Sequence, residues 1–448
     1  VAALSTAQLQ RLTTTQLNGL STTDIAEFTT TQIAALSTTQ VRGLSDGNVG
    51  ALADTQIAAL TTTQLAAATT SNLAALDATQ VGVLTTTQLG AVTGTQLAGL
   101  TASDMAEFTA DQIGSFTNTQ ARSLTATSLA DLADTQIQAF STTSLRGISA
   151  TAIGSLSETQ LAALTTDQVS SLVTAQLSAL NSTKFASFTE TQVEALTTTQ
   201  VAGISNTNLT ALGASQLAAL SETQVAALTA TQVGALTTTN VSALTETQVG
   251  AMTTTQIKAL STTNLSALEA TQAAALTTTQ IANLTTTQAG ALTGTDITEL
   301  SAEQMGAFTS TMLARLGTEA VVALDANQIA EFNTTQIAAL TTTQLSALEA
   351  GDIAEFNETQ IATLTATQVR ALTTTAVAAL AETQMAALTT AQVQALSTTS
   401  LSDLEATQVA AMTTTQVRAI TASQITALST TDVQEFTTDQ VAAFTTTQ

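Results

Sequence analysis

Pairs of carboxylates three residues apart are the residues of this chain whose types and spacing could do chemistry. Two carboxylates on one face of a short helix can serve acid–base catalysis, or they can bind a cation such as Ca²⁺ through their oxygens. The pairs recur along the chain and do not converge in one stretch, so we expect no catalytic cleft and at most weak Ca²⁺ binding at the surface. The candidate metal ligands are Asp24, Glu27, Asp104, Glu107, Asp352, Glu355, Asp432 and Glu435.

Most other catalytic chemistry lacks its side chains in this sequence. The chain contains no His and no Cys, which removes the usual catalytic dyads and triads and the soft-metal sites. No glycine-rich phosphate loop and no strict calcium-binding loop is present. We therefore predict that the protein is not an enzyme and that it holds no cofactor other than Ca²⁺ at surface carboxylates.

The charge of the chain limits its partners. There are 33 Asp and Glu residues against nine Lys and Arg, for a net charge of −24. Nucleic acids and anionic membrane surfaces are recognised by clustered Lys and Arg, so neither is an expected partner. No run of about eighteen apolar residues exists, so we expect no insertion into a membrane. The absence of Cys fits a secreted protein and is equally compatible with the cytosol.

An eight-residue repeat, here called the octad, organises the whole chain. Large apolar residues are spaced alternately by five and three residues from end to end, and 448/8 gives 56 copies. Fixed self-similarity of this kind indicates a solenoid. We therefore expect one continuous repeat body over residues 1–448. The chain begins at Val1 and stops at an octad boundary, so we also expect it to be part of a longer array.

Each octad carries the signals of a helix start. In residues 60–67, Leu-Thr-Thr-Thr-Gln-Leu-Ala-Ala, Thr61 is the expected N-cap. Its hydroxyl would accept from the Gln64 N–H while the Gln64 side chain accepts from the Thr61 N–H, which is a capping box. Leu60 and Leu65 occupy the two positions of a hydrophobic staple. The next Leu-Thr pair starts another cap at once, so the predicted unit is a very short helix followed by a corner.

Two other folds use the same residues. A continuous helix would rotate successive octads by about 80° around its axis, so no lasting apolar stripe would form, and we reject it. A β-solenoid is the serious alternative because Thr, Val and Ile favour strands. The odd spacing of the apolar residues places them on opposite faces of a strand, however, and alanine pairs are poor strand formers. We therefore predict an all-α solenoid.

A second period appears where the octad's glutamine is replaced. Octad positions are counted here from the N-cap, so that Thr61 is the first position, Gln64 the fourth, Leu65 the fifth and Ala68 the eighth. The regular replacements are three or four octads apart. Fifteen gaps separate Asp24 from Asp432, so the mean gap is about 27 residues, or roughly 3.4 octads, a recurrence expected of a superhelical turn. This period predicts that each octad nests between two octads of the next turn. The replacements are Asp24, Asn48, Asn72, Asp104, Ser128, Ala152, Lys184, Asn208, Asn240, Asn264, Asp296, Ala320, Asp352, Ala376, Ser400 and Asp432, with Ser144 and Met312 as extras.

The octads with a replaced glutamine share two further features, both of which predict a stripe along one side of the solenoid. An acid often stands three residues after the replacement, as at Glu27, Glu107, Asp131, Glu299, Glu355, Asp403 and Glu435. A phenylalanine often follows, as at Phe28, Phe108, Phe188, Phe356 and Phe436. We interpret these features as a longitudinal stripe with phenylalanine below and acid above, which either forms a lateral contact for self-association into fibres or bundles, or a cation-binding edge, or merely meets solvent differently.

Some octads depart from the pattern. Ala53 and Ala133 cannot cap with a side chain, and we expect the following Asp54 and Asp134 to cap one residue later. Val173 also removes the capping hydroxyl. The expected weak points of the core are the small residues at apolar positions, which are Ala68, Ala121, Ala273 and Ala289.

The Leu-(Ser/Thr)-Thr-Thr-Gln runs, such as that beginning at Leu60, resemble the Thr/Gln-rich short-repeat regions of large bacterial cell-surface or secreted proteins described as adhesin-like. The resemblance covers the whole chain and implies a stalk or fibre at the cell surface or outside the cell. We expect an extracellular structural protein that forms a rod, filament, sheath or adhesin stalk. The alternatives are a regular threonine array that binds ice or polysaccharide, and an intracellular scaffold. The dense Ser/Thr surface and several N-x-S/T triplets could carry glycans.

Overall fold

The computed structural model describes residues 1–448 and contains helices and turns but no β-strand. It has 55 α-helices of four to six residues each. Helix αn begins at residue 8n − 2, so α1 begins at Thr6 and α55 begins at Thr438. The predicted all-α solenoid of short capped helices is confirmed, and the β-solenoid alternative is wrong.

The helices differ only in where they end, and five residues is the commonest length. The four-residue helices are α1, α11, α16, α23, α33, α39 and α43. The six-residue helices are α4, α8, α15, α17, α18, α19, α20, α21, α28, α29, α31, α32, α36, α45, α46, α48, α49, α51, α52, α53 and α55.

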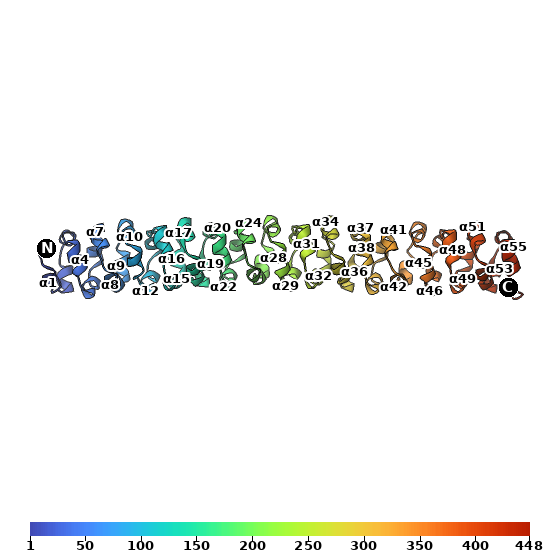
Figure 1. Cartoon of the computed structure of the whole chain (residues 1–448), viewed down its shortest axis with the longest axis horizontal. Helices are drawn as coiled ribbons and strands as arrows, with labels where there is room; N and C mark the ends of the chain where they lie inside the picture. Colours follow the sequence, from blue (N-terminus) through green and yellow to red (C-terminus); the bar gives the residue numbers. More distant parts are fainter. The chain divides into compact units, whose positions relative to one another are not determined.

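The chain divides into two compact units of nearly equal size. The first covers residues 1–228 and contains α1 to α28, and the second covers residues 229–448 and contains α29 to α55. In each unit the helices follow one another in sequence order, as the colours of Figure 1 show. Each unit is therefore a stack in which an octad meets only octads of neighbouring turns, the arrangement of a solenoid.

The helix starts are those that the sequence predicts. At α8 (Thr62–Ala67), the Thr61 hydroxyl accepts from the Gln64 N–H at 3.2 Å, and the Gln64 Oε1 accepts from the Thr61 N–H at 2.7 Å. At Ala53 only the second half of the box exists, the N–H of Ala53 donating to Gln56 at 2.7 Å. The expected later cap by Asp54 is wrong, because α7 (Asp54–Ala58) already begins at that residue. The same correction holds for Asp134, the first residue of α17 (Asp134–Ala139).

The apolar core follows the fifth and eighth positions of the octad. Ile57 and Leu65 are almost completely buried, and Leu60 between them is 9 % exposed. The glutamine at the fourth position is buried beside them, with Gln64 only 2 % exposed. Three of every eight side chains therefore point inward, and the threonines at the second and third positions remain largely exposed.

Each helix packs against the helix three octads away and reaches the one four octads away. Helix α8 contacts α5 (Thr38–Arg42), whereas its Gln64 side chain donates to Ile33 and Leu36 at the end of α4 (Thr30–Ala35). A turn therefore holds more than three and fewer than four octads. The predicted nesting of an octad between two octads of the neighbouring turn is confirmed.

Small residues allow the turns to approach one another. A Cβ on Gly154 would lie 2.9 Å from the carbonyl oxygen of Ala179, which is closer than real Cβ atoms come to such an atom. A Cβ on Gly114 would lie 3.0 Å from the carbonyl oxygen of Ala139 in the same way. In both contacts glycine relieves a crowded spot between one octad and the octad three later.

Two of the predicted weak points leave small voids in the core. A cavity of about 20 Å³ is lined by Ala68 with Leu60, Leu65 and other apolar residues, and a second of about 20 Å³ is lined by Ala273 with Leu268 and its neighbours. Alanine is too short to fill the space that leucine or valine fills in other octads. The truncated side chains thus locate the packing defects correctly.

The phenylalanines of the expected stripe belong to the core, so the rings themselves cannot form its lateral contact. Their exposed fractions lie between 2 % and 7 %. They occupy the eighth octad position, where leucine stands elsewhere, so their rings face inward like the leucines they replace. The buried rings are those of Phe28, Phe108, Phe188, Phe356 and Phe436.

No helix of this fold has the length and apolar character needed to cross a membrane.

Replacing a core leucine tests the nearest-neighbour character of the stack. Leu161 of α20 (Glu158–Ala163) is fully buried, so Leu161→Ala should lower the free energy of unfolding by about 2–5 kcal/mol. Hydrogen exchange should show lost protection in the turns on either side of α20 and unchanged protection several turns away. The exposed Ala162→Ser serves as the control, and uniform loss of protection along the unit would contradict the expectation.

Candidate functional site

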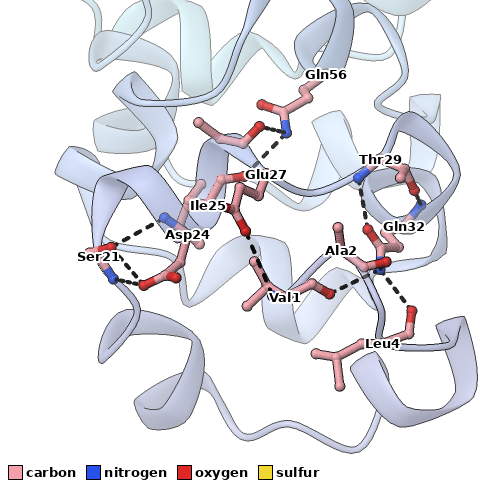
Figure 2. A network of polar contacts seen from close by, with 11 residues as sticks. Val1, Ala2, Leu4, Ser21, Asp24, Ile25, Glu27, Thr29, Gln32 and Gln56 are labelled. Atoms are coloured by element: carbon pink, nitrogen blue, oxygen red, sulfur yellow. Dashed lines mark hydrogen bonds and ion pairs between the residues drawn. The ribbon is translucent and has the colours of Figure 1, made fainter.

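The buried glutamine at the fourth octad position is the most elaborate polar site of the molecule. Figure 2 shows it at Gln32, where the Oε1 atom accepts from the Thr29 N–H at 2.7 Å. The Gln32 Nε2 atom donates in the opposite direction, to the carbonyl oxygen of Leu4 at 2.7 Å and, at 3.3 Å, to that of Ala2. One amide therefore completes the start of its own helix and holds the neighbouring turn.

The same geometry recurs along both units. In the first unit, the Gln200 Nε2 donates to Val169 at 2.8 Å and to Leu172 at 2.7 Å, which are 31 and 28 residues earlier. In the second unit, Gln392 donates to Ile361 and Leu364 at 2.7 Å with the same two spacings. The acceptors are carbonyls at the end of a short helix: Leu172 and Leu364 are C-cap residues, and Val169 and Ile361 accept otherwise from the N–H of those C-cap residues. We call this arrangement the glutamine joint.

Some replacements of the glutamine keep a donor for the joint. The Asn72 Nδ2 donates to the carbonyl of Leu44 at 3.0 Å, and the Lys184 Nζ donates to that of Gly154 at 2.7 Å. The Ser144 hydroxyl reaches the carbonyl of Phe116 at 3.0 Å. Alanine and ionised aspartate carry no side-chain donor, so their octads lack this bond.

The positions at which the glutamine is replaced lie in octads of successive turns. We call this row of positions the seam. Helix α3 (Thr22–Ala26) contains Asp24 and contacts α6 (Asp46–Gly50), which in turn contacts α9 (Thr70–Ala74). Replacements three octads apart therefore stand on directly contacting helices. The inference that these exceptions mark one side of a superhelix agrees with this arrangement within each unit.

The aspartates of the seam serve as capping-box residues. The Asp24 carboxylate accepts from the Ser21 hydroxyl at 2.6 Å and from the Ser21 N–H at 3.0 Å, as Figure 2 shows. These bonds, with the hydroxyl bond first, lower the pKa of Asp24 below its usual 3.8. Bonds from the hydroxyls of Ser402 and then Ser429 lower the pKa of Asp432 in the same direction.

The remaining predicted aspartates are held in the same way. The Asp104 carboxylate accepts from the Thr101 N–H at 2.8 Å, and that of Asp352 accepts from the Glu349 N–H at 2.7 Å. Both carboxylates thus face the backbone of their own helix start.

The glutamates that follow these aspartates are less well satisfied. Burial, followed by the charges of Asp352 and Asp325, raises the pKa of Glu355 above its usual 4.5. The Glu355 Oε2 atom is buried and has no hydrogen-bond partner. The pKa values of Glu107, Glu299 and Glu435 are also raised, first by burial and then by the negative charges of nearby acidic side chains.

Glu27 has different surroundings. Its Oε2 lies 3.8 Å from the ammonium group of Val1, and its side chain is 56 % exposed. Along the seam, the aspartates are thus tied to helix starts, whereas Glu107, Glu299, Glu355 and Glu435, which follow four of them, are left with little compensation.

The predicted cation ligands do not assemble into a multidentate site. No group of three or more acidic side chains is arranged to hold a metal ion. Each aspartate of a predicted pair is turned toward its own helix start. Weak Ca²⁺ binding at Asp24, Glu27, Asp104, Glu107, Asp352, Glu355, Asp432 and Glu435 stays a prediction.

Sequence reasoning missed the second half of the glutamine joint. The capping box accounts only for Oε1, and glutamate could fill that role as well. None of the 56 octads has glutamate at the fourth position, although glutamate would also favour the positive end of a helix. Where a carboxylate does stand there, it is the shorter aspartate, in only five of the 56 octads, so the preference for the amide is the signal that an N–H donor is needed.

Comparison with known families identifies a repeat in part of the chain. The model of the ALTTAQ repeat matches residues 1–38, 25–62, 201–238, 231–262 and 409–446. The matched segments lie in both units, and together with the 55 regular helices they establish a repeat protein. No curated protein matches the chain.

Removing one joint tests its contribution to stability. Gln200 is 3 % exposed and makes the two inter-turn bonds together with the bond from the Thr197 N–H at 2.7 Å. Gln200→Ala should lower the free energy of unfolding by about 2–4 kcal/mol, because the Leu172 carbonyl and the Thr197 N–H lose their partners and the Val169 carbonyl loses one of its two. Gln8→Ala is the matched control, since the exposed Gln8 side chain bonds only to Ser5. Equal losses in denaturant titrations of the two variants would contradict the importance of the inter-turn bonds.

The raised pKa of Glu355 predicts a pH-dependent stability change. A folded-state pKa above 4.5 means that the folded chain binds this proton more tightly than the unfolded chain. The ionised form, which dominates near neutral pH, therefore lowers stability. Glu355→Gln should raise the melting temperature at pH 7, with a gain that shrinks as the pH falls through the raised pKa and below 4.5. Glu331→Gln, at the same octad position but after Gln328, is the control, and a gain at Glu355 independent of pH would refute the assignment.

Proposed function

We propose that this chain is an extracellular structural protein, a segment of a rod, filament, sheath or adhesin stalk. The observation that carries the proposal is the glutamine joint, in which a buried amide in most octads caps its own helix and also binds one turn to the next. Joints such as those of Gln64, Gln200 and Gln392 use the same spacing, so resistance to separation is distributed along each unit. A protein whose task is length and stiffness needs this kind of repeated, equivalent contact.

The surface supports the same proposal. The outward positions are mostly threonine, serine and alanine, and the acids outnumber the bases 33 to nine. Such a surface stays hydrated and repels other acidic copies at close range, so contacts between copies would have to be selective. Because the phenylalanines of the expected stripe are buried, we infer that self-association would use the exposed polar faces.

The extracellular location rests on the composition and on the resemblance to repeat regions of bacterial surface proteins. A chain without Cys cannot form wrong disulfides in an oxidising compartment. Binding of ice or polysaccharide by threonine rows is one of the two alternatives, the other being an intracellular scaffold. The threonine-row alternative needs a flat β face, and the helical octads place their exposed threonines on separate short helices instead.

Small-angle X-ray scattering of the purified chain tests the rod proposal. About 16 turns at the usual helix-packing distance would give a particle of ~130–165 Å, with a radius of gyration of ~38–48 Å for a thin rod. A compact globule of this length would have a radius of gyration of ~22 Å. Electron cryo-microscopy should show a turn spacing of ~8–10 Å in the same sample. A radius of gyration near the globular value would reject the rod.

A further inference from the structure

Two surface hollows in the second unit have the same construction. The first has a volume of about 400 Å³ and the second a volume of about 500 Å³. Their linings correspond residue by residue at a constant offset of 17 octads. The first is lined by Ser242, Leu244, Thr245, Glu246, Thr247, Glu269, Thr271 and Gln272, and the second by Ala378, Leu380, Ala381, Glu382, Thr383, Glu405, Thr407 and Gln408.

The offset places the two hollows on the same side of the solenoid. At roughly 3.4 octads per turn, 17 octads make five whole turns, so the second hollow faces the same way as the first. The hollows are therefore separated along the axis by ~40–50 Å at the usual spacing of packed helices. Two like sites that face the same way suit one extended partner.

Each hollow contains a glutamate that breaks the capping rule of the octad. Glu269 stands at the N-cap of α34 (Ala270–Ala274), and Glu405 stands at the N-cap of α51 (Ala406–Ala411). Neither side chain makes a capping bond, although threonine, serine, aspartate or asparagine would. Both helix starts keep only the bond from the glutamate N–H to the following glutamine. A residue that lacks the capping hydrogen bond usual at its position, with no compensating structural contact, is a candidate for a functional role.

A second glutamate joins each hollow from the turn below. Glu246 is the first residue of α31 (Glu246–Ala251), and Glu382 is the first residue of α48 (Glu382–Ala387). All four carboxylates are exposed, and none forms an ion pair with a Lys or Arg. The neighbouring lining is made of threonine hydroxyls over a buried leucine, Leu244 in one hollow and Leu380 in the other. Such a hollow offers acceptors for a cationic donor and an apolar floor for its carbon stem.

We propose that each hollow receives the ammonium or guanidinium group of a basic side chain from a partner polypeptide. Two carboxylates without a counter-ion, in a chain of net charge −24, favour a cationic group electrostatically. The separation of the hollows favours a polypeptide, because a small polyamine cannot reach both of them. Simultaneous use of both hollows raises the overall affinity by linking the two binding events. This binding does not depend on the proposed rod function.

The test is binding of a fluorescent oligolysine of about 16 residues, which spans ~50 Å when extended, to the full chain. The double variant Glu269→Thr, Glu405→Thr introduces the usual capping residue, so its melting temperature should be equal or higher. Its affinity for the peptide should fall at least tenfold at near-physiological salt. The variant Glu246→Thr, Glu382→Thr should show the same loss and guards against an unexpected folding defect in the first.

The matched control changes the net charge equally outside the hollows. Glu349 is also an N-cap glutamate without a capping bond, but Ala326 takes the place of the second glutamate three octads earlier. The variant Glu303→Thr, Glu349→Thr should therefore bind the peptide within about twofold of the original chain. An equal loss in this control would show diffuse charge attraction and overturn the proposal. Unchanged binding in both hollow variants would also overturn it.

A second probe separates a polypeptide partner from a small amine. Spermine carries several ammonium groups but can occupy only one hollow at a time. It should bind at least tenfold more weakly than the oligolysine. Spermine binding that is as tight as the peptide's, and that the same glutamate changes abolish, would refute the polypeptide partner.

Discussion

The constraint on which this structure depends is the supply of partners for the ends of very short helices. An α-helix leaves four N–H groups and four carbonyls without internal partners, so a helix of about five residues is mostly ends. In the octad, two side chains supply hydrogen-bond partners for both ends of the helices. The N-cap hydroxyl and Gln Oε1 serve the start of the helix, and Gln Nε2 from a later octad serves the end of an earlier one, as Gln64 does for Ile33 and Leu36. Local structure and stacking therefore depend on the same amide.

The sequence predicted the features that arise from local rules and from period. The capping box at Thr61 and Gln64 needs only residue types at a fixed spacing, and the recurrence of the replacements every three or four octads follows from counting. Both were confirmed because neighbouring octads obey the same geometry. The inter-turn half of the joint was missed. Its acceptors at Leu172 and Val169 are backbone carbonyls 28 and 31 residues from Gln200. Every residue has such a carbonyl, so the residue types do not reveal which carbonyls accept.

The phenylalanines show a different limit. They recur at steps such as that from Phe28 to Phe108, and this recurrence identified one side of the solenoid. A sequence period indicates the direction of a side chain around the axis, but it does not indicate how deeply the side chain is buried. The eighth octad position is a core position whatever apolar residue fills it, so Phe188 is buried like Leu180 before it. The acids of the seam were located better. Their position predicted a carboxylate row, whereas the binding of Asp24 to Ser21 and the unsatisfied oxygen of Glu355 required coordinates.

The non-integer turn has a consequence for how such a chain can evolve. Adding or deleting one octad leaves every capping box intact, yet it changes the azimuth of all later surface residues by about 106°, which is a full circle divided by roughly 3.4. At about 3.4 octads per turn, 17 octads, or five turns, is the shortest insertion that restores the original direction. Duplication of a single octad thus rotates the surface residues that follow it about the solenoid axis, while the core keeps its structure. Selection for a shared facing would preserve blocks of 17 octads, the offset that separates the two hollows.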